Sequence, residues 1–317
     1  MARRRTSLHV SAGNNAVSAL DDAAAIQGFS LSLRASGRSE HTQATYGAAI
    51  AGLQRFTRER RMPPLVSLTA EHIREYLNSL YERGNKPATV ANRFRSLQQF
   101  YRWLVEEGER TDSPMDRISP PRVPDQILPH YGPNGVQKVL DTIGAKTRDV
   151  LALRDRAMVI TFFDTGLRAR ELCGLKMESL DLHGLSLLVT GKGGRQRRVG
   201  IGYMAAQAIE RYHRRRAHSA CVFSDRYGGP MTFNAVKMAL MRRFQAAGVP
   251  FHGVHGFRRG FAIAFLEAGG GPEDLRTLAG WESPQMLRRY TRATETERAL
   301  KAHRTFSPGD QLQTKGG

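Results

Sequence analysis

The sequence predicts a mostly α-helical protein with a small β-sheet, divided into two domains. Three observations predict this fold class. An apolar period of helical spacing runs through the first third of the chain, a proline-rich stretch follows it, and a single hairpin pattern lies among further helical segments. The chain has 317 residues, of which 40% are hydrophobic. A chain of this size is long enough for each domain to bury a core of its own.

Residues 21–111 are expected to form a bundle of four helices. Apolar side chains recur at helical spacing, as at Tyr46, Ile50 and Leu53, and this spacing places them on one face of a helix. Thr69 is a candidate N-cap, because its hydroxyl can accept a hydrogen bond from an amide of the turn that follows. A helix with one apolar face must bury that face against a neighbour, so the pattern predicts a packed bundle.

Residues 112–133 contain six of the 14 prolines. Proline has no amide N–H and cannot continue the hydrogen bonds of a helix interior or a central strand. This density therefore predicts an extended linker between the two domains. Residues 1–20 have no apolar period and are predicted to be a flexible basic arm, and residues 306–317 are predicted to be a flexible tail.

Residues 134–305 are expected to form the second domain. Strand-like runs at 185–189 and 197–199 flank the sequence Gly-Lys-Gly-Gly at 191–194, which predicts a β-hairpin with a tight glycine turn. Around this hairpin the apolar spacing predicts helices near residues 134–143, 149–164, 203–217, 232–247, 255–269, 272–279 and 284–303.

The charge balance indicates which kind of molecule the protein binds. The 48 Lys and Arg residues exceed the 29 Asp and Glu residues, which gives a formal net charge of +19. Such an excess points to a polyanion, with nucleic acid ahead of an anionic membrane. Composition alone leaves a ribosome-like or merely adhesive basic protein about equally open.

The sequence has no pattern typical of a membrane span, a disulfide framework or a zinc site. No run of about eighteen apolar residues is present, and the basic start lacks the apolar core of a signal peptide. The two cysteines, Cys173 and Cys221, belong to no CxxC or Cys/His cluster. We therefore expect a cytoplasmic protein that does not enter the membrane.

Five short motifs of the second domain occur in a fixed order: Thr165–Glu171, Gly191–Gly194, His255–Arg258, Leu278–Trp281 and Arg289–Thr291. In order and spacing they resemble the catalytic domain of tyrosine recombinases of the phage integrase family, of Xer- or Cre-like type. The helical bundle likewise resembles that family's core-binding (SAM-like) domain, so the resemblance covers residues 21–305. Each motif alone is weak evidence, but five in sequence are specific.

Arg168 and Arg258 suit a site that cleaves a phosphodiester. Cleavage places extra negative charge on the nonbridging oxygens. A planar guanidinium donates two parallel hydrogen bonds to such oxygens, and it needs no metal ion to do so. Arg258 follows His255 by three residues, which places both on one face of a helix. In a chain so rich in arginine, either one alone would as readily be a solvated surface residue.

The resemblance implies roles for four further residues. Tyr290 is the expected nucleophile, His255 the general base, and Lys192 the general acid that protonates the leaving 5′ oxygen. Trp281 stands where many members have His, and it resembles the Cre-like variant in which the indole N–H donates to the phosphate. Taken singly, these residues have ordinary alternatives: a core tyrosine, a structural histidine, and a hairpin lysine that binds DNA nonspecifically.

Glu171 is expected to orient Arg168 or His255, and the alternative is a simple surface ion pair with Arg168. Two other positions depart from the commonest pattern of the family. Arg259 stands where a histidine often follows the second arginine, and Gly200 replaces the usual proline after the hairpin. The second departure affects only the local loop geometry.

The resemblance implies a site-specific recombinase that cleaves and rejoins double-stranded DNA through a 3′-phosphotyrosine intermediate and a Holliday junction, as a homo-tetramer on DNA. We expect no metal ion, small-molecule cofactor or membrane to take part. Two alternatives stay open. A type IB topoisomerase-like enzyme is disfavoured by the distinct N-terminal bundle, and a catalytically silent DNA-binding regulator is disfavoured by the complete set of motif residues. The sequence pattern does not indicate which DNA sequence is the target or which subtype of recombinase this is.

Overall fold

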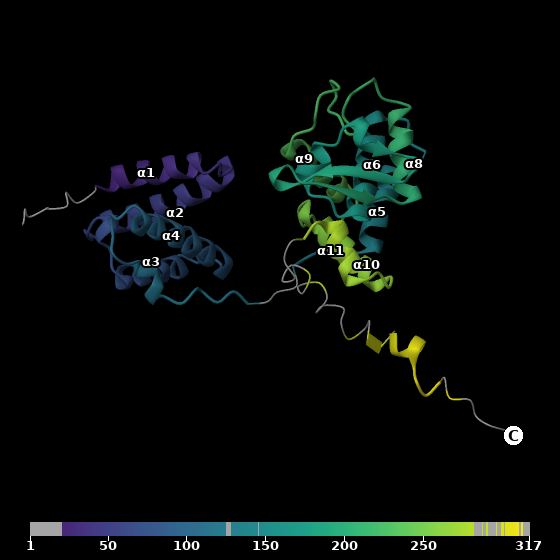
Figure 1. The fold of residues 1–317 in the computed structure, drawn as a ribbon. Coiled ribbons are helices and arrows are strands. Elements are labelled where there is room, and N and C mark those ends of the chain that lie inside the picture. Colours follow the sequence, from purple (N-terminus) through teal and green to yellow (C-terminus); the bar gives the residue numbers. More distant parts are fainter. Residues whose placement is uncertain are drawn as a thin grey trace, which may run out of the picture. The chain divides into compact units, whose positions relative to one another are not determined.

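In the computed structural model the chain forms two compact units, residues 1–125 and 126–317 (Figure 1). The structure describes residues 21–124, 128–144 and 146–281, with only the backbone of Lys192, and residues 287, 290, 296, 299–300, 302–310 and 312. The predicted arm at 1–20 and most of the predicted helix at 284–303 lie outside the described residues.

The first unit is the predicted bundle of helices. It consists of α1 (Asp22–Ala35), α2 (Glu40–Glu59), α3 (Ala70–Glu82) and α4 (Pro87–Glu106). Its core includes Phe29, Leu53 and Phe94, which the helical spacing places on the inner faces. Thr69 precedes α3, and its amide donates to Nδ1 of His72 at 3.1 Å, so α3 begins where the sequence indicates.

The segment after α4 is not extended throughout. Pro114–Arg117 forms a short 3₁₀ helix, and the Ser113 hydroxyl accepts a hydrogen bond from the Met115 amide at 3.2 Å. Met115 is 1% exposed and belongs to the core of the first unit. The prediction of an extended linker is therefore wrong for residues 114–117. A proline at the first position of a helical turn loses no hydrogen bond, so proline density alone does not exclude such a turn.

Seven α-helices with defined bounds lie in the second unit, and described residues 302–306 are also helical. Two differ from the prediction. The short α7 was missed because five residues, little more than one turn, are too few to show an apolar period. Helix α8 ends at His213 rather than near residue 217, and the Arg216 guanidinium beyond it lies 5.1 Å from the centroid of the Tyr212 ring. No described helix of either unit is long and apolar enough to cross a membrane. The seven are α5 (Pro133–Ile143), α6 (Val150–Thr165), α7 (Ala169–Cys173), α8 (Tyr203–His213), α9 (Phe233–Ala246), α10 (His255–Glu267) and α11 (Pro272–Ala279).

The described strands form one antiparallel sheet in the order β1 (Leu180–Asp181), β2 (Ser186–Thr190) and β3 (Gln196–Gly200). Strands β2 and β3 are the predicted hairpin, whereas the two residues of β1 are too few to show a strand pattern. The turn between β2 and β3 contains Gly193 and Gly194 at φ of 74° and 77°, a backbone region that favours glycine.

Helix α10 contributes side chains to both hydrophobic cores of the second unit. Phe257 packs against Phe162 and Phe244 in the main core, with ring centroids 5.6 and 5.5 Å apart. One turn later Phe261 belongs to a smaller cluster with Trp281 and Tyr290. Figure 1 shows α10 beside α11, next to the strands. The residues between Phe257 and Phe261 are therefore fixed from both sides.

Helix α6 ends at Gly166, which is left-handed at φ 60°. A Cβ added there would collide with the Phe261 ring. Gly248, which follows α9 at φ 62°, has open space around the same position. The two glycines share a backbone conformation and differ in packing.

We expect Gly248→Ala to lose about 1–2 kcal/mol of unfolding free energy from the left-handed backbone alone. Gly166→Ala should lose a further amount of about 1–3 kcal/mol from overpacking. Urea unfolding in a Trp103→Phe background measures both, because Trp281 fluorescence then reports the second unit. Equal losses in the two variants would show that Phe261 moves aside freely.

Candidate active site

Arg258 is the central group of the expected site. It lies in α10, is 1% exposed, and donates from Nη1 to the Gly166 carbonyl at 2.8 Å and from Nη2 to the Ala279 carbonyl at 2.6 Å. Burial, together with the positive charge of Arg168, lowers the pKa of Arg258 to about 10, so the guanidinium stays protonated at neutral pH. Each terminal nitrogen carries two hydrogens, and the carbonyl takes one of them.

Arg168 lies at the start of α7 and is held by Glu171. Its amide donates to Oε2 of Glu171 at 2.8 Å, and its Nη1 donates to Oε1 at 2.7 Å. The Glu171 side chain is 4% exposed and that of Arg168 is 42% exposed, so the pair is not a simple surface ion pair. Burial alone would raise the pKa of Glu171, but hydrogen bonds from Arg197 and Arg168 outweigh it and lower that pKa to about 2.

His255 is the first residue of α10, one turn before Arg258. The residue keeps contact with solvent. Partial burial, aided by the positive charges of Arg259, Arg258 and Arg168, lowers its pKa to about 4. The imidazole is therefore neutral at physiological pH, which is the form that can accept a proton.

Trp281 and Tyr290 stack face to face, with ring centroids 4.9 Å apart and an interplanar angle of 4°. The Arg258 guanidinium lies over the indole, 5.3 Å from the ring centroid. Both aromatic side chains are buried. The buried indole Nε1 of Trp281 has no hydrogen-bond partner among the described residues. An unsatisfied buried donor is unfavourable, so an acceptor such as a phosphate oxygen would stabilise it.

The structure brings the described side chains of the expected site into one connected set. Arg168 forms an ion pair with Glu171. The Arg258 guanidinium lies over Trp281, which stacks on Tyr290. The charges of Arg168 and Arg258 both lower the pKa of His255. The backbone of Lys192 lies in the turn between β2 and β3. A Cβ added at the preceding Gly191 would stand 3.7 Å from Oε1 of Glu171, so the start of this turn borders the same carboxylate.

Arg197 was not predicted as a site residue. It lies in β3 and forms a bidentate ion pair with Glu171, at 2.9 Å from Nη1 to Oε1 and 3.0 Å from Nη2 to Oε2. Strand alternation contained a signal for it, because Arg197 shares a face with the buried Val199. A charged residue on the buried face of a strand requires a partner of opposite charge.

The two departures from the family pattern have local consequences. Arg259 donates from Nε to the Pro129 carbonyl at 2.7 Å, and so fastens the segment before α5 to α10. Gly200 pairs with Ser186 at the end of the β2–β3 ladder and has open space around its Cα. The positive charge of Arg259 also acts electrostatically on His255 and Tyr290.

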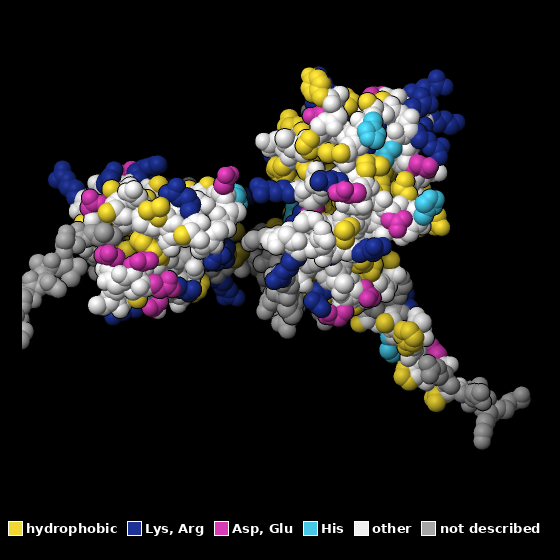
Figure 2. Space-filling view, turned by 45° about the horizontal axis from the view of Figure 1, so that its top comes forward, with side chains coloured by type: hydrophobic (Ala, Val, Ile, Leu, Met, Phe, Trp, Pro, Cys, Tyr) yellow, Lys and Arg dark blue, Asp and Glu magenta, His cyan; other side chains and the backbone are white. Residues whose placement is uncertain are grey.

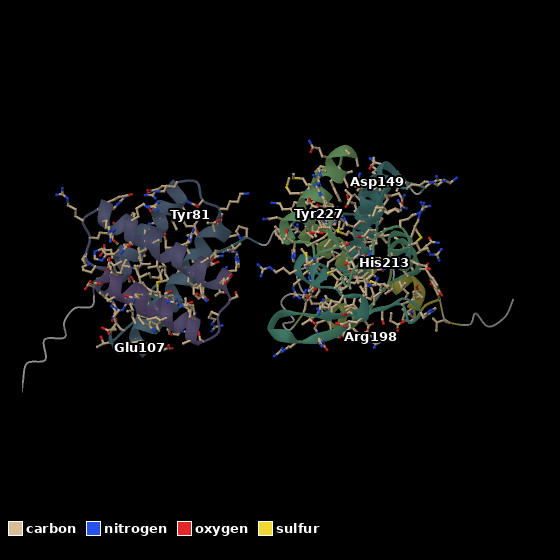
Figure 3. The ribbon with its side chains drawn as sticks, turned by 90° about the horizontal axis from the view of Figure 1, so that it is seen from above. Tyr81, Glu107, Asp149, Arg198, His213 and Tyr227 are labelled. Carbon is tan, nitrogen blue, oxygen red and sulfur yellow. The ribbon has the colours of Figure 1, made fainter. Side chains whose placement is uncertain are left out.

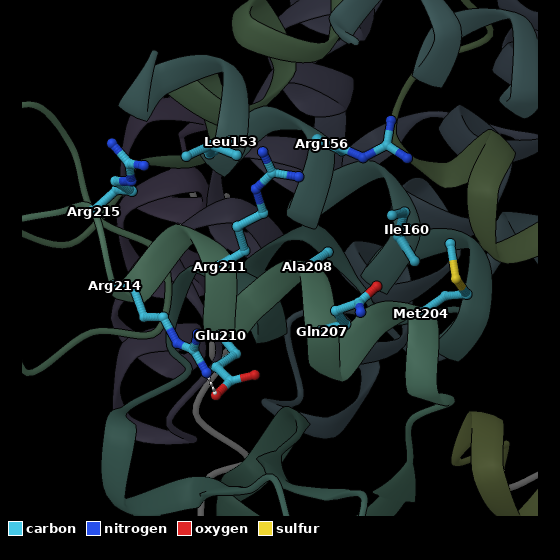
Figure 4. A pocket seen from close by; sticks show the side chains of 10 residues that line it. All are labelled: Leu153, Arg156, Ile160, Met204, Gln207, Ala208, Glu210, Arg211, Arg214 and Arg215. Atoms are coloured by element: carbon cyan, nitrogen blue, oxygen red, sulfur yellow. Dashed lines mark hydrogen bonds and ion pairs between the residues drawn. The ribbon is translucent and has the colours of Figure 1, made fainter. Parts of the chain in front are cut away.

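A separate groove of about 580 Å³ lies between α6 and α8 (Figure 4). Arg156, Arg211, Arg214 and Arg215 line it, together with the apolar side chain of Ile160 and others. None of the expected site residues lines this groove. Figure 2 shows Lys and Arg side chains over the visible surface of both units, so a basic groove is one part of a generally basic surface. Among the described residues, no group of three or more His, Cys, Asp or Glu could hold a metal ion.

Two family models match the chain, one on each unit. The model described as "Phage integrase family" matches residues 133–297, and "Phage integrase, N-terminal SAM-like domain" matches residues 26–108. Among curated relatives, tyrosine recombinase XerC of Myxococcus xanthus is 31% identical over 278 residues, which cover 81% of this chain and 89% of the relative. XerC of Xylella fastidiosa strain M23 is 30% identical over 258 residues, covering 80% and 87%.

Solved structures have the same fold. XerH site-specific recombinase bound to palindromic difH substrate matches with a TM-score of 0.70 at 18% identity, covering 89% of this chain and 84% of that one. A lambda integrase dimer bound to a COC′ core site matches with a TM-score of 0.67 at 19% identity, covering 84% and 76%. Fold and sequence thus define a DNA-recombinase class of protein. The chain belongs to the phage integrase family of tyrosine recombinases.

We expect the His255 imidazole to titrate near pH 4 in the free protein rather than near 6.5. Because its folded pKa lies below the unfolded value, the fold loses stability as the pH falls through this window. Histidine ring NMR measures the midpoint. Arg259→Gln should raise the midpoint, whereas Arg276→Gln, which removes an exposed arginine paired with Glu273, should leave it unchanged. A midpoint near 6.5 in the unaltered protein would contradict the neutral assignment.

Proposed function

We propose that this chain cleaves and rejoins specific sites in double-stranded DNA, with Tyr290 as nucleophile. The observation that carries the proposal is the stack of Tyr290 on Trp281 beneath the buried guanidinium of Arg258. Tyr290 lies there beside fixed cations and an indole N–H that has no partner among the described residues. This arrangement suits an anion that reacts at the tyrosine hydroxyl.

In the proposed reaction the neutral imidazole of His255 accepts the phenolic proton of Tyr290. The phenolic oxygen attacks the scissile phosphorus and forms a 3′-phosphotyrosine, while the bond from phosphorus to the 5′ oxygen breaks. Lys192 supplies a proton to that leaving oxygen. Reversal of the step, with a 5′ hydroxyl of another strand as nucleophile, rejoins the DNA and leads through a Holliday junction.

Arg168, Arg258 and Trp281 stabilise the negative charge that develops on the nonbridging oxygens. The two guanidiniums provide fixed positive charge in a partly dehydrated site, where electrostatic attraction is stronger than in water. The indole N–H of Trp281 adds a neutral donor. Because the phosphotyrosine keeps the energy of the broken ester bond, the cycle requires no nucleotide cofactor and, with arginines in this role, no metal ion.

The oligomeric state and location are part of the proposal. A lambda integrase tetramer bound to a Holliday junction is among the similar structures, with a TM-score of 0.68, and we infer a tetramer on DNA for this chain. We place its action in the cytoplasm, where free thiols such as Cys173 and Cys221 persist. The named relatives are recombinases, so neither the topoisomerase nor the silent-regulator alternative is favoured.

Tyr290→Phe should abolish the covalent protein–DNA adduct and leave DNA binding nearly unchanged, because only the nucleophilic hydroxyl is lost. A duplex nicked near the cleavage site traps the adduct, and gel separation under denaturing conditions measures it. Tyr203→Phe is the matched control, since Tyr203 is an exposed tyrosine at the start of α8. Adduct at the ordinary level in Tyr290→Phe would disprove the nucleophile assignment.

Truncation after Arg292 should impair tetramer assembly and recombination while single protomers still bind DNA. The removed segment includes Leu300 and Phe306, which are 57% and 69% exposed, and such side chains suit a groove on a neighbouring protomer. Native gels of the DNA complexes and a recombination assay give the two readouts. Truncation after Asp310 is the control, and full recombination by the shorter chain would refute the coupling role.

A further inference from the structure

We propose that Arg197 is a positioning residue of the recombination site. It holds Glu171 and the end of α11 in place, so that Arg168 and Trp281 keep their positions around the scissile phosphate. The inference rests on the proposed function and extends it to a residue outside the motif set.

The first support is the geometry of the ion pair. The two parallel hydrogen bonds between Arg197 and Glu171, at 2.9 and 3.0 Å, fix both the distance and the plane of the carboxylate. The side chains of Arg197 and Glu171 are 16% and 4% exposed. A buried pair with this geometry is far less screened by solvent than a surface pair.

The second support is the sharing of one carboxylate by two arginines. Glu171 accepts from both Arg168 and Arg197, so the trio carries a net charge of +1. If Arg168 were the sole partner of Glu171, the carboxylate would largely cancel the positive charge of Arg168. Arg197 offsets the carboxylate instead, and the more exposed Arg168 guanidinium keeps its positive charge available for a phosphate.

The third support is a contact with α11. Arg197 donates from Nε to the Leu278 carbonyl at 3.1 Å. A Cβ added at Gly280, which is left-handed at φ 62°, would stand 3.0 Å from Cδ and Nε of Arg197. The next residue along the chain is Trp281, which stacks on Tyr290. Arg197 therefore links the glutamate that holds Arg168 to the segment that presents the nucleophile's stacking partner.

The fourth support is the position of Arg197 in the hairpin. It pairs with Val189 across the β2–β3 ladder, a few residues beyond the turn that carries Lys192. Its Nε, Nη1 and Nη2 all donate to protein atoms. Because these hydrogen bonds direct the side chain toward the protein, Arg197 is a positioning residue and not a group that touches the phosphate.

The test compares Arg197→Gln with Arg198→Gln in the full chain. Arg198, which Figure 3 labels, is the next residue of β3, is exposed, and donates to Ser186 Oγ at 3.3 Å. Single-turnover adduct formation on a nicked duplex gives the rate, and a binding titration gives the Kd. Arg197→Gln should slow adduct formation about 10- to 100-fold with little change in Kd, as is usual for residues that orient a reacting group. Arg198→Gln should leave the rate unchanged.

Two further readouts separate positioning from general structural damage. In a double-mutant cycle with Glu171→Gln, the double variant should be about as slow as the slower single variant, because both changes break one unit. The pH profile should also change. Without Arg197, burial of Glu171 would raise its pKa, with Arg168 and Arg258 as the remaining nearby cations, so acidification should produce a second loss of rate in addition to the one caused by protonation of His255.

The outcomes are distinct. Equal rates for Arg197→Gln and Arg198→Gln, or additive effects in the cycle, would overturn this inference and leave the proposed function intact. Absence of any adduct with the unaltered chain on its own target DNA would overturn both. If Arg197→Gln does not fold, Arg197→Lys keeps the charge but lacks the bidentate fork. A normal rate for folded Arg197→Lys would overturn the requirement for the fork.

Discussion

Arg258 is a charged side chain that is 1% exposed, and a protein tolerates such a group only when its N–H groups are bonded. The carbonyls that bond it belong to Gly166 and Ala279, the ends of α6 and α11. Three helices must therefore end or pass at fixed positions for Arg258 to be satisfied. Arg168 follows the end of α6 by a few residues, and Trp281 follows the end of α11. The hydrogen bonds of one guanidinium therefore determine where the rest of the candidate site lies.

The site concentrates positive charge around one carboxylate. Arg168, Arg197 and Arg258 face Glu171, and their mutual repulsion is unfavourable to the free protein. The indole N–H of Trp281, which has no partner in the part of the chain that the structure describes, adds to this cost. Both unfavourable features are relieved by the same ligand, an anion with several acceptor oxygens. Two unfavourable features at the place where a phosphate would bind indicate a site organised in advance for the charge of the reaction.

The sequence predicted the fold class, the four-helix bundle and the β2–β3 hairpin, because long apolar periods and glycine turns are local signals. It did not predict α7, β1 or the turn at Met115, which are too short for a period and depend on tertiary packing. The order of the motifs predicted that Arg258 and Tyr290 belong to the same active site. Arg197 was missed because its importance comes from Glu171, 26 positions earlier, and a single chain does not reveal which charges meet.

The neutral state of His255 connects binding to chemistry. In the free protein the positive charges of Arg259, Arg258 and Arg168 act with partial burial to keep the imidazole unprotonated, and this also makes it a weak base. A bound phosphate would place negative charge among the same arginines and offset their repulsion. The sign follows from electrostatics: an added anion favours imidazolium and raises the pKa of the histidine. In the proposed reaction, the scissile phosphate itself would therefore strengthen the base that takes the proton from Tyr290, so that proton transfer is favoured when DNA occupies the site.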